Sequence, residues 1–396
     1  MKKLKVLWTA LAVMVCCMAM SGAAMAANYV RNPEVTAARS GCTFVYVDGI
    51  LDANQTDTNY CLNKVNELRK AAYEAGTISE NVTMNWSHEL TEIAQTRAAE
   101  QVLRHGTKRP NGTDYTTMTY GAVKPDGEIV AYKCDTNMQL AFDAILKDTT
   151  YYNMLTNPSY KYMSVGMFVH NGEGYMAIEL EDGSDVHTSG SSISDSVDQK
   201  LEVLTSAVSA LSFTGKSTIR VGTVAEYKMN NITVTFDTTK TTLNNSAYVT
   251  WSADDTSLAA AANVQGVGKI TALNWGYTVI RAKLDNMSAK MKLDIKPRVD
   301  NKVSGFRISV KKKKLKIRWN KNASLFANHS SLVGYHLEIA TDAKFKNIVK
   351  VKDFGPNRKK CNFKGKKKTK YYVRIAYRFS DGTLGYYTTK AKKTRR

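Results

Sequence analysis

The sequence predicts an α+β fold class, in which a domain of mixed helices and strands is followed by two all-β sandwiches. Two periodicities indicate this. Between residues 62 and 145, apolar residues recur every three to four positions in three separate runs, the spacing that places them on one face of a helix. From about residue 200 onward, apolar and polar residues alternate in short runs between turn residues, as in the strands of sandwiches. The length of 396 residues is enough for three domains of ordinary size.

The first residues have the layout of a secretory signal peptide. Three early lysines precede an apolar run over residues 6–20, and Ala24-Met25-Ala26 supplies small residues for cleavage. The run is too short to span a bilayer, and no second long apolar stretch follows it. We therefore expect residues 1–26 to be removed and the mature chain to be secreted without a transmembrane anchor. Residues 27–54 would then form an amino-terminal extension.

The extension and the following domain contain one expected strand and three expected helices. In the extension, the apolar segment 43–47 predicts a strand that ends at Asp48-Gly49. A first helix is expected over the apolar positions of residues 62–72, a second after the N-cap signal at Ser87, and a third through residues 138–145.

Several short motifs accompany these helices. In chain order they are Asn66-Glu67-Leu68-Arg69, Arg97-Ala98-Ala99-Glu100, Arg109-Pro110-Asn111-Gly112, Gly127-Glu128-Ile129-Val130 and Asn157-Pro158-Ser159-Tyr160. A motif such as R-P-N-G is by itself only a turn. Together, their order and spacing resemble the CAP superfamily, the cysteine-rich secretory, antigen and pathogenesis-related proteins, in its bacterial form. The resemblance covers residues 55–187 and implies a CAP α-β-α sandwich with a groove for an unidentified ligand.

The family's groove residues are mostly absent from this sequence. Members with an intact groove carry two histidines and one or two glutamates, which can hold a divalent metal or transfer protons. Aligning the motifs places Thr107 at the first histidine position and Thr150, or Tyr151, at the second. The glutamate of the family's G-E-N-I motif is retained as Glu128. One carboxylate does not make a metal site, so we expect no metal and no cofactor.

The weak catalytic candidates are therefore Glu128 and His105, and each has a structural alternative. Glu128 could be a groove carboxylate, or it could accept backbone N–H groups or bind a neighbouring cation. His105 is more simply explained as a cation near the end of the second helix, where the helix dipole favours positive charge. His170 is expected in an exposed hairpin turn, and His187 at the edge of a linker is expected to be uninvolved.

Four cysteines remain after the signal peptide, at positions 42, 61, 134 and 361. An even number in a secreted chain allows disulfides with three connectivities. Cys61 lies on an apolar helix face and is expected to be a buried small residue. A bridge from Cys42 to Cys61 or to Cys134 is the alternative.

The composition changes after the CAP-like domain. Residues 188–199 are rich in serine and are expected to be a linker. Within residues 200–296, the segments Trp251-Ser252-Ala253-Asp254, Gly268-Lys269-Ile270-Thr271-Ala272 and Gly276-Tyr277-Thr278-Val279-Ile280-Arg281-Ala282 resemble the bacterial immunoglobulin-like domain of group two. In that reading Trp251 is a core anchor between two sheets.

The last module, residues 298–396, alternates inward and outward residues in three clear strands over 315–319, 334–340 and 371–377. These strands resemble the B, C and F strands of a fibronectin type III module. The integrin-binding tripeptide R-G-D is absent from it.

The positive charge of the chain is concentrated in this last module. Residues 300–396 contain 28 Lys and Arg against 5 Asp and Glu, a surplus of 23, whereas residues 1–299 contain 28 against 30. Solvated lysines that block strand edges explain a surplus of a few charges. The larger surplus favours an anionic partner, with the runs Lys311, Lys312, Lys313, Lys314 and Lys366, Lys367, Lys368 as candidate binding residues.

These observations lead to three hypotheses. The primary one is an exported, non-enzymatic bacterial binding protein, whose basic module binds an anionic cell-wall polymer or acidic glycan and holds the CAP-like domain at the cell envelope. The first alternative is a secreted CAP-type hydrolase or protease that uses Glu128, and the second is a purely adhesive or structural surface protein. Nucleic acid is disfavoured as a partner because the chain is expected to leave the cytosol and carries no recognised nucleic-acid-binding motif.

Overall fold

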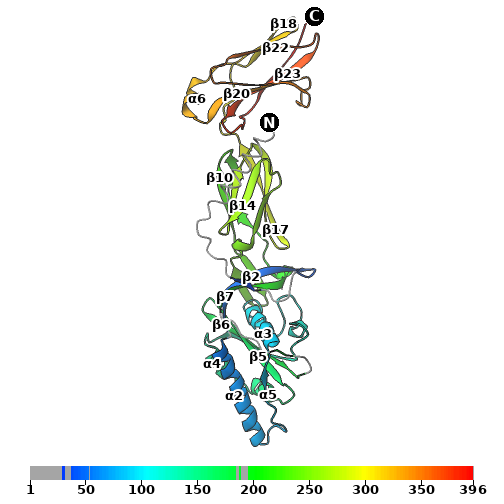
Figure 1. Ribbon diagram of the computed structural model, residues 1–396, viewed down its shortest axis with the longest axis vertical. Coiled ribbons are helices and arrows are strands. Elements are labelled where there is room, and N and C mark those ends of the chain that lie inside the picture. The colour runs from blue at the N-terminus through cyan, green and yellow to red at the C-terminus, as the bar shows by residue number, and fades with distance from the viewer. Residues whose placement is uncertain (1–28, 32–36, 53, 184–186, 189–194, 396) are drawn as a thin grey trace. The chain divides into compact units, whose positions relative to one another are not determined.

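The computed structural model describes residues 29–31, 37–52, 54–183, 187–188 and 195–395, so the expected signal peptide lies outside the described residues. The chain is rich in β-structure and divides into two compact units. The first unit comprises residues 1–212, 229–249 and 283–288, and the second comprises residues 213–228, 250–282 and 289–396. Figure 1 shows the strands and helices of each unit.

The first unit is built on a seven-stranded sheet with the strand order β1-β7-β2-β5-β6-β4 and β3 beside β5. Its strands are β1 (Tyr29–Arg31), β2 (Cys42–Asp52), β3 (Asn85–Trp86), β4 (Gly127–Cys134), β5 (Tyr162–His170), β6 (Glu173–Glu181) and β7 (Asp195–Leu204). The hairpin between β5 and β6 turns at Asn171-Gly172, where both residues have positive φ. An Asn-Gly pair is suited to this two-residue turn because both residues tolerate that backbone conformation.

Helices cover both faces of this sheet. They are α2 (Gln55–Glu74), α3 (His88–Glu100), α4 (Met138–Ile145) and α5 (Thr149–Thr156). The helices α2, α4 and α5 share one apolar core with the side chains of Met163, Val165 and Met167 on β5. The helix α3 packs on the opposite face, where a Cβ atom at Gly166 would lie 2.3 Å from the backbone of Ala94. Gly166 therefore allows α3 to approach the sheet closely.

The helix starts follow from capping side chains. Asn54, Ser87, Asn137 and Asp148 each stand immediately before a helix and accept a hydrogen bond from a backbone N–H of its first turn. The three helices expected from periodicity are α2, α3 and α4, and Ser87 begins α3 as predicted. The short helix α5 was not predicted from periodicity.

Two expectations about the segments flanking the first domain are wrong. The strand β2 continues through Asp48-Gly49 to Asp52, because Gly49 has no side chain and lets the ring of Phe168 pass over it, where a Cβ would lie 2.4 Å away. Residues 195–199, expected to belong to a linker, form the first half of β7, which pairs along β2 from Cys42↔Leu204 to Leu51↔Asp195. Residues 42–52 of the extension and residues 195–199 thus belong to one sheet.

A hairpin from the immunoglobulin-like region also belongs to the first unit. It consists of β11 (Ile232–Phe236) and β12 (Thr239–Leu243). The Thr241 hydroxyl donates to the Val102 carbonyl at 2.9 Å, and the Arg104 guanidinium lies 5.1 Å from the Phe236 ring centroid. Nearby, the Tyr46 and Tyr248 rings stack at 3.7 Å. The compact units therefore do not follow the boundary expected at residue 200.

The rest of the immunoglobulin-like region forms two four-stranded sheets, with the orders β14-β15-β10-β8 and β13-β16-β17-β9. Their strands are β8 (Phe213–Thr214), β9 (Thr218–Arg220), β10 (Val224–Met229), β13 (Thr250–Ala253), β14 (Ala259–Val264), β15 (Val267–Ala272), β16 (Gly276–Leu284) and β17 (Met287–Lys296). Trp251 is buried against Phe213 and Tyr227, as expected of a core anchor.

The last module is a sandwich of a three-stranded sheet, β18-β19-β22, and a four-stranded sheet, β21-β20-β23-β24. Its elements are β18 (Arg307–Lys311), β19 (Lys314–Arg318), α6 (Ala323–Asn328), β20 (Leu332–Ala340), β21 (Ile348–Phe354), β22 (Lys360–Lys364), β23 (Lys370–Phe379) and β24 (Thr388–Lys393). The three strands expected from the sequence are β19, β20 and β23. Their inward residues share one core that includes Trp319, Tyr335 and Tyr377.

All four described cysteines are free thiols. The bridges considered from Cys42 are therefore not formed, and Cys61 is fully buried in the apolar core beneath α2, as expected. Burial raises the pKa of the Cys61 thiol well above its usual range.

Candidate functional site

The motif arginine Arg69 holds the loop that follows α5. Its guanidinium, fully buried, donates four hydrogen bonds of 2.7 to 3.1 Å to backbone carbonyl oxygens. The acceptors are the carbonyls of Leu155, Val82, Tyr160 and Asn157. Burial lowers the pKa of Arg69 to about 10, so it remains charged at neutral pH. Arg69 ends the motif N-E-L-R, and the carbonyls of Asn157 and Tyr160 belong to the motif N-P-S-Y. Both motifs therefore stabilise the fold.

A second set of motif residues forms a buried charge network beside α3. Arg97 and Glu100 are completely buried, and they pair with each other one helical turn apart. The Arg109 guanidinium, from the R-P-N-G turn, donates to Glu100 at 2.8 Å. Burial by itself would raise the pKa of Glu100, but Arg109 and Arg97 outweigh it and lower that pKa. The same turn reaches β7, where the Asn111 amide donates to Glu202 at 2.8 Å.

Glu128 belongs to this network. Arg97 Nε donates to Glu128 Oε1 at 2.5 Å, and Glu128 lies directly opposite Glu179 across β4 and β6. Burial raises the pKa of Glu128 despite Arg97. Burial and the charge of Glu128 raise the pKa of Glu179 well above its usual range. No donor side chain or backbone N–H bonds the Glu179 oxygens among the described residues.

The charge balance of the network follows from these directions. Two arginines compensate two carboxylates, and the raised pKa of the fully buried Glu179 favours this group as the one that keeps its proton. A neutral Glu179 can donate its proton to the Glu128 carboxylate opposite. One of the roles expected for Glu128 is to bind a neighbouring cation. The structure supports this role, because Arg97 donates to both oxygens of Glu128.

The other residues of the expected groove do not gather around Glu128. His105 is exposed, and its ring lies 4.8 Å from that of Tyr132. It does not cap α3, which ends at Glu100; instead the Gln101 side chain bonds both backbone groups of Gly106. Thr107 and Thr150, at the histidine positions, are exposed. We therefore find no constellation of Glu128 with a histidine among the described residues.

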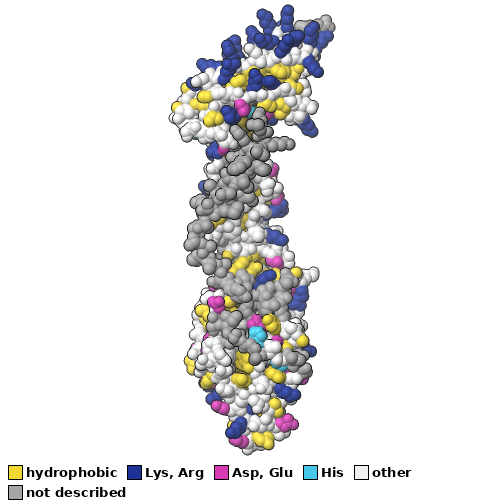
Figure 2. All heavy atoms as spheres, in the orientation of Figure 1, with side chains coloured by type: hydrophobic (Ala, Val, Ile, Leu, Met, Phe, Trp, Pro, Cys, Tyr) yellow, Lys and Arg dark blue, Asp and Glu magenta, His cyan; other side chains and the backbone are white. Residues whose placement is uncertain are grey.

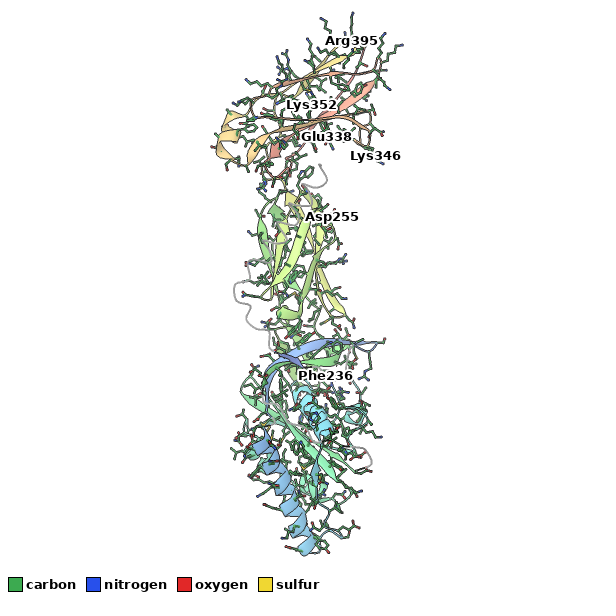
Figure 3. The ribbon with its side chains drawn as sticks, in the orientation of Figure 1. Phe236, Asp255, Glu338, Lys346, Lys352 and Arg395 are labelled. Atoms are coloured by element: carbon green, nitrogen blue, oxygen red, sulfur yellow. The ribbon has the colours of Figure 1, made fainter. Side chains whose placement is uncertain are left out.

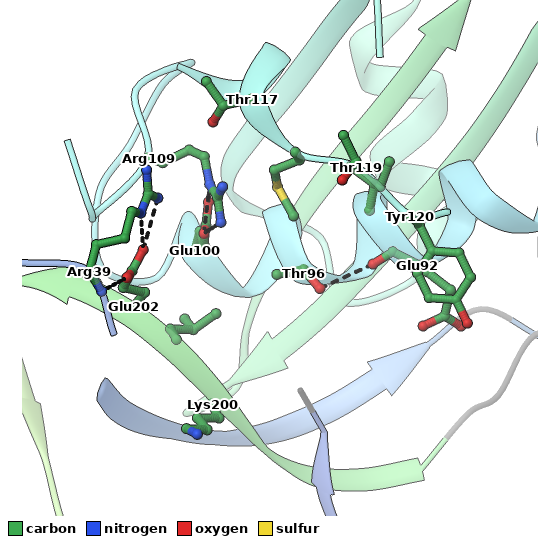
Figure 4. Close-up of a pocket in the computed structure, with 13 residues that line it drawn as sticks. Arg39, Glu92, Thr96, Glu100, Arg109, Thr117, Thr119, Tyr120, Lys200 and Glu202 are labelled. Atoms are coloured by element: carbon green, nitrogen blue, oxygen red, sulfur yellow. Dashed lines mark hydrogen bonds and ion pairs between the residues drawn. The ribbon is translucent and has the colours of Figure 1, made fainter. Parts of the chain in front are cut away.

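A cavity of about 290 Å³ lies next to the network, between α3, the loop after the R-P-N-G turn, and β7 (Figure 4). It is lined by Arg39, Glu92, Ile93, Thr96, Glu100, Arg109, Thr117, Met118, Thr119, Tyr120, Lys200, Leu201 and Glu202. Two ion pairs border it, Arg39–Glu202 at 2.8 Å and Arg109–Glu100 at 2.8 Å. The cavity has room for a small polar molecule. Sequence reasoning missed it because half of its charged wall comes from the extension and from β7.

Two histidines differ from their expected roles. His170 is buried, and its Nδ1 lies 2.7 Å from the Asp48 carbonyl oxygen, because β2 runs on beside the hairpin and covers the ring. His187 lies between Ser87 Oγ, 2.8 Å from Nδ1, and Glu181 Oε2, 2.9 Å from Nε2. Its ring also stacks on Tyr162 at 3.7 Å.

The contacts from Ser87 to His187 and from His187 to Glu181 resemble those of a hydrolytic triad. Here, however, the three residues have a structural role. Ser87 is fully buried, and its Oγ accepts the Leu90 N–H as the N-cap of α3. A nucleophile must reach its substrate, and this oxygen is enclosed. Thr188 donates its backbone N–H and its hydroxyl to Glu89 in the same helix turn. Together these contacts attach residues 187–188 to the start of α3.

Among the described residues, one group of carboxylates could share a cation. The ligand oxygens of Asp126, Glu181 and Asp182 lie within 4.8 Å of one another. Asp126 and Asp182 are exposed to solvent, and Glu181 already bonds His187. The group is therefore explained as a cluster of solvated surface carboxylates. It does not include Glu128.

The lysines of the last module form a second hollow surface. A cleft of about 800 Å³ is lined by Lys311, Lys312, Lys313, Lys314, Asn362, Phe363, Lys364 and Lys367. The structure thus brings the first predicted lysine run together with Lys367, whereas Lys366 and Lys368 are exposed but do not line the cleft. Lys312 and Lys368 have φ values of 53° and 52°, a conformation that favours glycine or asparagine. Figure 2 shows how densely Lys and Arg side chains cover this module.

No family model matches the chain, and no curated protein matches it. Solved structures similar to parts of it are fibronectin type III domains. The FN5 domain of Drosophila Lar is 17% identical, covering 25% of this chain and 99% of its own, with a TM-score of 0.19. The fn3 domain of human contactin 1 is 10% identical over 24% of this chain and 76% of its own, with a TM-score of 0.20. The FN1-FN3 domains of chicken CNTN1 are 8% identical over 69% of this chain and 99% of their own, with a TM-score of 0.23. At these scores the matches carry no functional argument.

The described helices are all too short or too polar to cross a membrane.

Proposed function

We propose that this chain is an exported bacterial multi-domain binding protein, in which a non-enzymatic CAP-type domain is held at the cell envelope by a basic fibronectin type III-like module. The ligand of the basic module is an anionic cell-wall polymer. The expected signal peptide supports export, and the collinear motifs of residues 55–187 support a CAP-type domain.

The observation that carries the proposal is the division of charge. The last module holds a surplus of 23 positive charges, and the remainder of the chain is close to neutral. A field of one sign over one module attracts polyanions over long distances and gives little attraction to neutral partners. For a bacterial protein outside the cytosol, the polyanions within reach are wall polymers, acidic glycans and membrane surfaces, and we choose the wall polymer.

The arrangement around Glu128 supports a non-enzymatic first domain. A general acid or base must have a free position toward its substrate. Both oxygens of Glu128 bond Arg97, and its neighbour Glu179 is fully enclosed. The binding surface in this region is instead the cavity beside Arg39 and Arg109.

The hydrolase alternative uses Glu128, with His105 as the second candidate residue, and His105 is exposed in an aromatic contact with Tyr132. The purely adhesive alternative requires no ligand in the cavity. Activity on wall glycans or peptides that is lost in Glu128→Gln would favour the first. Salt-insensitive attachment of the chain to cells would favour the second.

The proposal is tested by sedimentation of the full mature chain with purified Gram-positive walls. Binding should be strong at low salt and weaken as the screening length falls from about 30 Å at 0.01 M to about 8 Å at 0.15 M. Walls stripped of teichoic acid should retain much less protein. Equal retention by stripped walls would exclude the anionic polymer as the ligand.

A further inference from the structure

The three-stranded sheet of the last module separates its residues sharply by charge. Inward side chains, such as Ile308, Leu315 and Ile317, lie in the apolar core. The outward positions are all exposed, and they are Arg307, Ser309, Lys311, Lys314, Lys316, Arg318, Lys360, Asn362 and Lys364. We call these outward residues of β18, β19 and β22 the cationic face. It carries no carboxylate and no apolar side chain.

The register of the strands arranges the cationic face in three rows. The rows are Arg307, Arg318, Lys360; then Ser309, Lys316, Asn362; then Lys311, Lys314, Lys364. Neighbouring members of a row are about 4.8 Å apart across the sheet, and rows follow one another about every 6.8 Å along it. Two rows of three cations thus flank a middle row that has one cation and two neutral hydrogen-bonding groups.

This arrangement works against the stability of the sheet. Like charges directly opposite each other on neighbouring strands are destabilising. Both outer rows consist of such pairs, for example Lys314 opposite Lys364 and Arg307 opposite Arg318. In the part of the chain that the structure describes, no carboxylate pairs with these cations, because the five Asp and Glu residues of the module are engaged elsewhere. Asp300 pairs with Arg220, Glu338 with Arg374, Asp342 with backbone N–H groups, Asp353 with His336 and Asp381 with Arg298.

Protection of sheet edges does not explain the cationic face. Lysines placed to block edge pairing belong on edge strands. Here three of the cations, Lys314, Lys316 and Arg318, lie on β19, which is the central strand of its sheet. A central strand has no free edge to protect. An external anion is the remaining source of compensation.

We propose that the cationic face is the binding site for a linear polyphosphodiester, the chemistry of teichoic acids, and that the cleft at the Lys311–Lys314 hairpin extends this site. The inference rests on the proposed function for the class of ligand and adds the surface that binds it. The flat, regularly spaced rows suit a polymer with a charge at every repeat. The outward positions of the face carry no apolar side chain to insert into a membrane and no aromatic ring on which a base could stack. Phe363, which lines the cleft, packs edge-to-face against Tyr371.

Two full-length variants that lose the same number of charges test this site. The face variant carries Lys311→Gln, Lys314→Gln, Lys316→Gln and Lys364→Gln. The control variant carries Lys344→Gln, Lys346→Gln, Lys350→Gln and Lys352→Gln, all exposed residues on or beside β21 of the other sheet. Figure 3 labels Lys346 and Lys352 of this control set. General attraction to the module falls equally in both variants, so a difference between them reports the site.

Binding of purified polyglycerol-phosphate teichoic acid is measured by calorimetry between 0.02 and about 0.2 M salt, a range over which counterion release dominates affinity. The face variant should bind at least about tenfold more weakly and show a salt slope lower by about three, whereas the control should lose about threefold or less. The face variant should also unfold at the same or a higher temperature than the parent, because like-charge pairs are removed.

Each outcome has one meaning. If the parent chain binds no teichoic acid at low salt, the proposed function fails. If the parent binds and both variants weaken equally, the proposed function stands and the cationic face is not the site. Duplex DNA and anionic vesicles are compared with teichoic acid at equal concentrations of negative charge. If the parent binds either of them more tightly than teichoic acid, the assignment of the polymer is wrong.

Discussion

The buried carboxyl group of Glu179 makes the stability of the first unit depend on pH in a specific direction. In the folded chain its pKa lies well above the ordinary value of 4.5, because of burial and of the adjacent Glu128 carboxylate. Between pH 4.5 and the pKa of Glu179 in the folded chain, the folded state holds one proton more than the unfolded state. Stability therefore falls as pH rises, by about 1.4 kcal/mol for each pH unit in that interval.

Replacing Glu179 by Gln removes this dependence. Glutamine has nearly the same shape, remains neutral at every pH and can still donate a hydrogen bond to Glu128. At pH 5 the two proteins should be similarly stable. If the interval extends past pH 7, the variant should be more stable there by about 3 kcal/mol, the effect of two pH units.

Hydrogen exchange on peptides from β4 and β6 measures this locally in the full chain. Protection in the parent, corrected for intrinsic exchange, should fall from pH 5 to pH 7 relative to Glu179→Gln. Exposed Glu226→Gln, in the second unit, is the matched control and should follow the parent. Parallel curves for Glu179→Gln and the parent would mean that Glu179 is ionised in the folded protein, and the charge balance of the network would be wrong.

Three further outcomes are expected. Arg69→Met should destabilise the first unit by about 3 to 5 kcal/mol, since four backbone carbonyls lose a charged donor, and exchange should rise first in residues 155–160. Gly166→Ala should lower the free energy of unfolding by at least about 1 to 3 kcal/mol, measured by thermal unfolding, because α3 must move away from the added methyl group. The control Gly355→Ala, where a Cβ meets no atom, should change stability little. In zinc titrations the parent should bind no better than Glu128→Ala, because hydroxyls at positions 107 and 150 are poor zinc ligands; tight stoichiometric binding lost with Glu128 would overturn the non-enzymatic proposal.

Much of the local structure could be predicted from the sequence because it depends on near neighbours. The periodic runs locate α2, α3 and α4, Ser87 locates the start of α3, and alternation locates β19, β20 and β23. These signals arise within a few residues of where they act. The net charge of the last module is likewise a sum that needs no geometry.

The features that were missed depend on pairings between distant segments. Residues 195–199 have a linker composition, and only their partner β2 makes them a strand. His170 and His187 occur in polar surroundings in the sequence, yet β2 covers one and the start of α3 holds the other. In the same way, the rows of the cationic face depend on the register of β18, β19 and β22, which a count of lysines does not contain.

The pairing of β2 with β7 has a consequence for the order of events during synthesis. Cys42 lies opposite Leu204, so this ladder cannot be completed until just over half of the chain has been made. Contacts between such distant residues fold slowly, and unpaired strands are exposed to aggregation while they wait. A ribosome-bound or truncated chain that stops before β7 leaves β2 with only its short pairing to β5 and with one edge unpaired. The shortest fragment of the first domain that can be produced in soluble form should therefore extend past residue 204, even though the domain expected from the sequence ends at residue 187.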